Sequence, residues 1–263
     1  MGYAFTFLVF KLLASCGIGC YVHYPTISTD MISSVESGNA AFNNDEAVAG
    51  SPLKTSIKLK YYQVFAVMYG FVAGLADLVI VNSSWTYNHI KHIWNPIVPV
   101  NLVYPPCDTT GLKALPLAGR KNFVVSIAQF RPEKNHMLQL EAMQLLVTQH
   151  PELQDAVLLM MGSLRAGNAE DQKIVDQLEK ARAEMGLEKH VQILKNVSND
   201  ELKANLAKAK AGLHTMYNEH FGIGVVELMA AGVIPIANNS AGPKEDIVVL
   251  DEDDQETGFL ALT

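Results

Sequence analysis

Short apolar runs alternate with longer amphipathic segments along the second half of the chain. The apolar runs are rich in β-branched and aliphatic residues and predict buried strands over 122–130, 155–162, 190–196, 211–217 and 232–237. The intervening segments predict helices over about 135–149, 168–186, 199–209 and 222–231. Alternation at these lengths indicates right-handed βαβ crossovers and a parallel sheet covered on both faces. We therefore expect a Rossmann-like domain in this half.

The first half of the chain is less regular, but strand-like and helical runs can still be recognised. They predict strands over 17–25, 77–84 and 98–106, a helix over about 53–75, and a long polar loop over 33–52. The stretch 107–122 carries Gly, Pro and mixed charge without periodicity. We place a domain boundary there and expect two domains, residues 1–118 and 119–263.

Two apolar segments of the first half each allow two interpretations. Residues 1–22 are apolar enough for a signal peptide or a membrane span, but Lys11 interrupts them and no basic region precedes them, which favours a buried helix followed by a strand. The 53–75 segment combines aromatic residues with Lys54, Lys58 and Lys60. It could lie on a membrane surface, although a helix packed on its own sheet is favoured.

Composition narrows the class of protein. Of the 263 residues, 49% are hydrophobic and 18% charged, which is typical of a folded core-forming chain. A net charge of -7 argues against a nucleic-acid partner, which would require clustered Lys and Arg. The three cysteines are too few for a disulfide framework, and no metal site is expected, because the spacing of Cys16 and Cys20 is not supported by nearby His pairs.

Polar residues follow several of the predicted strands, where open α/β sheets bind ligands. His23 follows a strand of the first half, while Gln129, Arg131 and Lys134 follow the first strand of the second half. Arg131 and Lys134 could bind a diphosphate or form a solvated surface pair. His23 could instead be a core histidine, although a functional role is favoured for it, whereas for His214, on a predicted strand, the core histidine is the favoured interpretation.

A second cluster lies in the stretch "NEHFGIGVVELMAAG", residues 218–232. Phe221, Gly222, Ile223 and Gly224 begin a helix whose free N–H groups and dipole suit a phosphate or a sugar ring. Glu227 lies inside this apolar helix, where its carboxylate needs a partner. That partner could be a structural Lys or Arg, or the two hydroxyls of a ribose, and Glu219 upstream could hold the hydroxyls of a transferred sugar.

The stretch "EHFGIGVVE" resembles the E-x7-E motif of retaining glycosyltransferases of family 4, which have a GT-B fold of two Rossmann-like domains. More closely, the chain is similar to the eukaryotic GDP-mannose-dependent α-1,2-mannosyltransferases of dolichol-linked oligosaccharide assembly. The similarity covers about residues 1–260 in six motifs: "YVHYPTISTDM", "VNSSWTYNHI", "VYPPCD", "QFRPEKNH", "GLHTMYNEHFGIGVVELMAAG" and "NSAGPKEDIV".

The resemblance implies a role for each candidate residue. Glu219 would contact the donor mannose, Glu227 the ribose of GDP, and Lys134 the diphosphate. Around them would lie Gly222 with the neighbouring amides of Phe221, Ile223 and Gly224, and His23 from the opposite domain near the mannose and leaving group. Gln129 stands where most family members have Arg, with Arg131 two positions away, and Ala128 replaces a frequent glycine.

The resemblance also implies the reaction and its setting. Mannose would pass from GDP-mannose to the 2-hydroxyl of a mannose on Man3GlcNAc2- or Man4GlcNAc2-diphosphodolichol, with retention of configuration. Neither a metal nor a cofactor beyond the donor is expected, and the partners are the endoplasmic reticulum membrane, on its cytosolic face, and other mannosyltransferases of the pathway. The family's first strand, glycine-rich acceptor loop, membrane anchor and final helix would lie outside this sequence, so the N-terminal domain is expected to be incomplete and the chain truncated at both ends.

Two rival functions remain open at this point. The chain could be a related α-1,3/1,6-mannosyltransferase, which differs in its acceptor linkage. It could also be a non-catalytic module that binds GDP or a partner without transferring sugar. The residues that would read guanine are not identified, and the loops near 162–165 and 195–198 are the places where they are expected.

Overall fold

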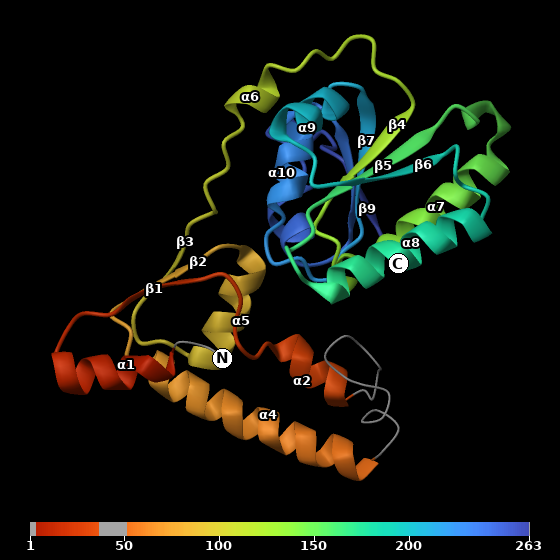
Figure 1. The fold of residues 1–263 in the computed structure, drawn as a ribbon. Helices are drawn as coiled ribbons and strands as arrows, with labels where there is room; N and C mark the ends of the chain where they lie inside the picture. Colours follow the sequence, from red (N-terminus) through yellow and green to blue (C-terminus); the bar gives the residue numbers. More distant parts are fainter. Residues whose placement is uncertain (1–3, 37–51, 263) are drawn as a thin grey trace. The chain divides into compact units, whose positions relative to one another are not determined.

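The computed structural model describes residues 4–36 and 52–262, and the chain divides into two compact units, Met1–Pro105 and Pro106–Thr263 (Figure 1). This division lies before the boundary expected at residue 118. The segment after Pro106 packs with the second unit, because Leu112 of the short helix α6 (Thr110–Lys113) belongs to that unit's core. Each unit contains its own parallel sheet, which confirms the expected α/β class.

The first unit has a three-stranded sheet of order β1-β2-β3, formed by Gly19–Val22, Leu78–Val81 and Val100–Leu102. Its helices are α1 (Phe5–Val9), which continues as a π-helical turn (Phe10–Ala14), α2 (Thr29–Glu36), α4 (Pro52–Ala73) and α5 (Ser84–Trp94). Ser83 caps α5 by accepting the N–H of Thr86 at 3.1 Å. Helix α2 occupies the start of the expected 33–52 loop, while 37–51 lies outside the described residues.

Both apolar segments of this unit are less buried than expected. The opening helix forms, but Val9, Leu12 and Leu13 are exposed, so the expectation of a buried helix is wrong for most of it. Its Lys11 instead pairs with Asp77 at 2.6 Å. Helix α4 buries its C-terminal end, where Tyr69, Val72 and Ala73 join the core of the unit. The expectation that α4 packs on its sheet therefore holds for that end only.

The second unit is a six-stranded parallel sheet of order β6-β5-β4-β7-β8-β9. The strands are β4 (Phe123–Ile127), β5 (Val157–Gly162), β6 (Val191–Lys195), β7 (Ala209–His214), β8 (Ile234–Asn238) and β9 (Phe259–Ala261). The first five correspond to the strands expected in this half, and β9 was not expected. The helices are α7 (His136–Gln149), α8 (Ala169–Glu184), α9 (Asn199–Leu206) and α10 (Ile223–Ala230), together with short turns at Pro132–Lys134, Pro151–Leu153 and Pro243–Ile247.

Successive side chains of β5 point to opposite faces of the sheet and belong to two different core clusters. Leu158 and Met160 pack with residues of α7 and α8, while Leu159 and Met161 pack with residues of α9 and α10. Helices therefore cover both faces, as Figure 1 shows, and both faces of the strands are apolar.

The strand order fixes where a ligand can bind. From β4 the chain proceeds to β5 and β6 on one side, and β7, β8 and β9 lie on the other. The order therefore reverses between β4 and β7, and crevices at such a switch point are the usual ligand sites of open α/β sheets. The loops that follow these two strands contain Lys134 and Glu219 respectively.

Candidate functional site

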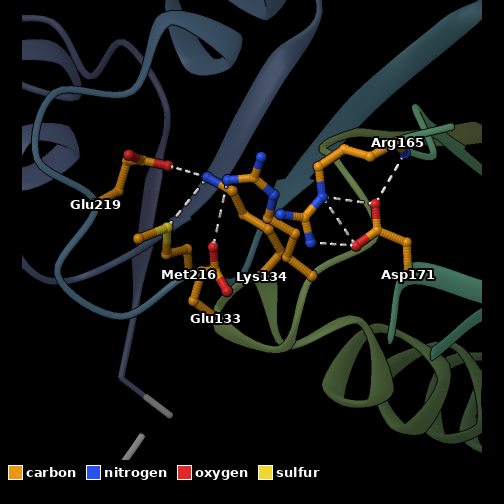
Figure 2. Close-up of polar contacts among 7 residues, drawn as sticks. Glu133, Lys134, Arg165, Asp171, Met216 and Glu219 are labelled. Carbon is orange, nitrogen blue, oxygen red and sulfur yellow. Dashed lines mark hydrogen bonds and ion pairs between the residues drawn. The ribbon is translucent and has the colours of Figure 1, made fainter. Parts of the chain in front are cut away.

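Lys134 and Glu219 meet at this switch point. Lys134 ends the 3-10 turn that follows β4, and its Nζ forms an ion pair with Oε2 of Glu219 in the loop after β7 (Figure 2). The same ammonium lies 3.1 Å from Sδ of Met216. The two side chains are 19% and 15% exposed, so the pair is largely shielded from water. Residues far apart in sequence thus converge on one place, as the sequence predicts.

The loop carrying Lys134 is attached to the end of β7 by hydrogen bonds. The Thr215 hydroxyl donates to the carbonyl oxygen of Lys134 at 2.8 Å, and Nε2 of the buried Gln139 donates to Thr215 Oγ1 at 2.9 Å. Asn135, which follows Lys134, adopts a left-handed conformation that turns the chain into α7. These contacts hold the main chain of Lys134 and thereby direct its side chain.

His214, at the end of β7, is the part of this site that the sequence did not reveal. It is buried, and its Nε2 lies 3.3 Å from Oε2 of Glu219. Burial by itself would raise the pKa of Glu219, but the close contact with the His214 ring and the Lys134 charge outweigh burial and lower this pKa to about 2. The favoured interpretation of His214 as an ordinary core histidine is incomplete, since its ring also contacts the candidate sugar-binding carboxylate.

Arg131 lies in a second charged cluster beside the first. Its Nη1 is 3.9 Å from Oε1 of Glu133, and its charge helps to lower the pKa of Asp171. The main cause of that lowering is Arg165, which donates to both carboxylate oxygens of Asp171 at 2.5 and 3.0 Å (Figure 2). Arg131 is therefore not held in a tight ion pair. Its Nε is buried without a hydrogen-bond partner in the described part of the chain.

Gln129 is exposed, and its carbonyl oxygen accepts the N–H of Arg131 at 2.8 Å. This contact fixes the main chain of the loop, while the Gln129 side chain makes no hydrogen bond with Lys134 or Glu219. Its assignment to substrate binding remains a prediction.

The first turn of α10 closes against the carboxyl end of β4. Gly222, the N-cap, has φ 109°, a conformation that a side chain would strain. A Cβ on Gly224 would lie 3.3 Å from the Ile127 carbonyl oxygen, so glycine permits the close approach. The N–H groups of Ile223 and Gly224 have no acceptor within the helix. Phe221, in contrast, is buried in a core cluster with Val225, so its side chain is not available to a ligand.

Glu227 has an environment opposite to that of Glu219. It lies one turn into α10 and is partly buried, and this burial raises the pKa of its carboxyl group. Within residues 4–36 and 52–262 no hydrogen-bond donor or basic side chain pairs with it, so the structural Lys or Arg partner considered above is not found there. Its side chain instead borders a cavity of about 220 Å³.

His23 belongs to the first unit. It follows β1, its ring packs against Tyr21 with centroids 4.6 Å apart, and it lines a cavity of about 530 Å³ within that unit. It is exposed, so it is not a buried core histidine. Its expected position near the mannose remains a prediction.

Comparison with known proteins places this geometry in a family. Residues 110–261 match the model for glycosyl transferases group 1, and residues 1–94 match that for the ALG11 mannosyltransferase N-terminus. The chain belongs to the glycosyl transferases group 1 family. Within the matched 110–261 region this group 1 member carries Lys134, Glu219 and Glu227, whereas His23 lies in the 1–94 match.

Two relatives of high identity carry the same name. The chain is 50% identical over 273 residues to a GDP-Man:Man(3)GlcNAc(2)-PP-Dol alpha-1,2-mannosyltransferase of Dictyostelium discoideum and 48% identical over 270 residues to the protein of that name from Homo sapiens. These matches cover 100% and 99% of this chain but only 53% and 54% of the relatives. The chain thus spans about half the length of the curated relatives it matches, and the resemblance seen in the motifs is confirmed.

Solved structures agree on the fold of this group 1 member. A crystal structure of Anabaena Alr3699/HepE in complex with UDP and glucose matches with a TM-score of 0.66 and 18% identity, over 98% of this chain and 62% of that chain. A UDP-forming trehalose-phosphate synthase from Burkholderia xenovorans matches with a TM-score of 0.64 and 13% identity, over 92% of this chain and 58% of that one. The expected GT-B fold class is thereby confirmed.

Neither a metal-binding cluster nor a membrane-spanning helix is present among the described residues. Among the described residues no group of three or more His, Cys, Asp or Glu side chains is arranged to hold a metal ion. In the same part of the chain we find no helix with the length and apolar character needed to cross a bilayer.

Proposed function

We propose that the chain binds GDP-mannose and contributes the donor site of a retaining mannosyltransferase that acts on Man3GlcNAc2- or Man4GlcNAc2-diphosphodolichol. The proposal follows the name shared by its relatives. The observation that carries it is the convergence of Lys134 and Glu219 at the β4/β7 switch point, beside a helix N-terminus.

In this proposal each group has a definite task. Lys134 and the N–H groups of Ile223 and Gly224 bind the diphosphate, whose negative charge grows as the bond between C1 and the phosphate oxygen breaks. Glu219 accepts hydrogen bonds from mannose hydroxyls and Glu227 accepts them from the ribose. Arg131 supplies a further positive charge, because it is free of a close ion pair. No protein nucleophile is assigned.

The diphosphate charge is met by these protein groups, so we propose that the reaction needs no metal ion or cofactor. Transfer measured with and without EDTA tests this directly. Equal rates are expected, and a loss of rate that Mg²⁺ or Mn²⁺ restores would contradict it.

Calorimetry with GDP, followed by a transfer assay with GDP-mannose and a diphosphodolichol-linked acceptor, tests the proposal as a whole. Wild type and the control Lys189→Ala, at an exposed position, should bind GDP equally, and Lys134→Ala should bind it at least about tenfold more weakly. Failure of wild type to bind GDP, or affinity of Lys134→Ala within about threefold of wild type, would refute it.

The assay also separates the rival functions. GDP binding without transfer would favour a non-catalytic module. Where transfer occurs, linkage analysis of the product distinguishes an α-1,2 bond from α-1,3 or α-1,6 bonds.

We further propose that the protein works at the cytosolic face of the endoplasmic reticulum membrane, where other mannosyltransferases of the pathway are potential partners. Helix α4 supports membrane contact. Ile57, Tyr61, Val64, Met68 and Phe71 recur at helical spacing and are between 53% and 72% exposed. The helix also carries three lysines and no acidic residue, which suits an anionic lipid surface.

Sedimentation with vesicles containing phosphatidylserine tests this contact. Val64→Glu should reduce binding several-fold, while the control Leu145→Glu, at an exposed apolar position of α7, should not. Equal binding of all three proteins would overturn the assignment of α4.

A further inference from the structure

The cavity beside Glu227 indicates where the base of the donor nucleotide binds. This inference rests on the proposed function. If Glu227 holds the ribose, the base must lie within the reach of one nucleoside. The cavity is formed within the second unit by α9, α10 and the segment around α6, and Asp108, Gly111, Asn199, Lys203 and Glu227 are among its lining residues. We propose that this cavity is the nucleobase pocket and that Asp108, Asn199 and Lys203 read the edge of guanine.

The size and the walls of the cavity suit a single ring system. About 220 Å³ is below the roughly 300–1,000 Å³ typical of pockets for whole drug-sized ligands, so a base fits while the sugar and phosphates must lie outside. Leu112, Leu202 and Leu206 supply apolar surface, and Leu206 is fully buried. Apolar side chains of this kind can pack against the flat faces of a purine.

The polar residues of the cavity match the donors and acceptors of guanine. Guanine presents the acceptors O6 and N7 together with the donors N1–H and N2–H₂. The Asp108 carboxylate can accept from N1–H and N2–H₂, whereas the Lys203 ammonium and the Asn199 amide can donate to O6 or N7. Adenine has an acceptor at N1 and a donor at N6, so it would face both Asp108 and Lys203 with the wrong groups.

Two of these residues are already oriented by the fold. Asp108 Oδ1 accepts the N–H of Thr110 at 3.1 Å, which fixes the carboxylate at the start of α6. The Lys203 side chain reaches from α9 to the segment around α6, because a Cβ added to Gly111 would lie 2.9 Å from Lys203 Nζ. The carboxylate and the ammonium therefore lie at the same side of the cavity.

The loops in which base-reading residues were expected are only partly consistent with this placement. Asn199 directly follows the 195–198 loop and lines the cavity. In the 162–165 loop, the guanidinium of Arg165 is bound to Asp171, and this residue does not line the cavity. The candidate base-reading residues therefore lie on α9 and just before α6, and not in the 162–165 loop.

Calorimetry with the 263-residue chain and four diphosphates, GDP, IDP, XDP and ADP, tests the pocket. Wild type should bind GDP best, IDP more weakly because it lacks the N2 amine, and ADP and XDP at least about tenfold more weakly. Asp108→Asn should lose about tenfold for GDP and gain for XDP, since the Asn amide can donate to the O2 carbonyl of xanthine. Asn can also keep the hydrogen bond to Thr110 through its own oxygen.

A second variant and two control variants distinguish a loss of base recognition from a general loss of nucleotide binding. Lys203→Met should weaken GDP and XDP to the same extent, because both carry O6. Asp253→Asn and Lys208→Met, at exposed positions outside the cavity, should leave all four affinities unchanged.

The outcomes separate this inference from the proposed function. If wild type binds none of the four nucleotides, the proposed function fails and the pocket assignment fails with it. If wild type binds GDP but the ratio of GDP to XDP affinity stays within about twofold in Asp108→Asn, the pocket assignment alone is overturned.

Discussion

The surroundings of Glu219 and Glu227 differ sharply although both carboxylates belong to one short stretch of sequence. Glu219 is paired with Lys134 and lies close to His214, and its pKa falls to about 2. Glu227 has no such partner in the described part of the chain, and burial raises its pKa. The protein thus satisfies one buried carboxylate by itself, while the other carries an uncompensated cost of burial that ligand hydroxyls could relieve.

The rate of mannose transfer should show the largest effect, because Lys134, the partner of Glu219, also faces the diphosphate. In protein that shows transfer, Lys134→Ala removes the charge that faces the growing negative charge of the diphosphate, so the rate should fall about a hundredfold or more. Initial rates with GDP-mannose measure this, with Lys189→Ala as the control. A rate within about threefold of wild type would mean that Lys134 serves only to neutralise Glu219.

Ribose recognition by Glu227 should appear in the affinity for GDP. Glu227→Gln replaces a carboxylate that accepts two hydroxyls and should weaken GDP about tenfold. The same change should have almost no effect on 2′,3′-dideoxy-GDP, which lacks both hydroxyls. An equal loss for the two ligands would show that Glu227 acts on the pocket's shape and not on the ribose.

The stability of the ligand-free protein should respond to the two carboxylates with opposite signs. Glu219→Gln breaks a buried ion pair and leaves Lys134 unpaired, so the free energy of unfolding should fall by about 2 kcal/mol. Glu227→Gln removes an unpaired charge from a partly buried position and should raise it by about 0.5 kcal/mol. Urea unfolding measures both changes. Destabilisation by both variants would remove the distinction between the two sites.

The pH dependence of these differences provides the finest test. Because the pKa of Glu219 falls on folding, from 4.5 to about 2, its ionisation stabilises the fold above pH 4.5, and this contribution is lost as the pH falls toward 2. Because the pKa of Glu227 rises on folding, the gain from its protonated form is complete below pH 4.5 and is lost as the pH rises through the folded value. Unfolding of wild type and each Gln variant between pH 2 and 7 should show these opposite trends.

The alternation of apolar runs and helical segments was enough to predict the second unit almost completely. Strand β9 was missed because it has only three residues and follows the polar stretch 251–258. The first unit was predicted less well. Helix α2 falls partly in a segment interpreted as a loop, and the exposure of α1 could not be read from its apolar sequence, since hydrophobicity does not say which surface is covered.

The site was predictable where a residue type has a restricted use and unpredictable where tertiary contacts decide its role. A carboxylate within the apolar α10 indicated a missing partner, and loops after parallel strands indicated convergence. In contrast, His214, Thr215 and Met216 look like ordinary residues at a strand end. Their contacts with Lys134 and Glu219 depend on the placement of β4 beside β7, which the local pattern does not specify.

A crystal structure of the chain with GDP tests the central claim most directly. We expect the diphosphate to lie on Lys134 and the first N–H groups of α10, with both ribose hydroxyls within hydrogen-bond distance of the Glu227 carboxylate. Nucleotide bound away from the β4/β7 switch point, or a Glu227 carboxylate that does not contact the ribose, would contradict it.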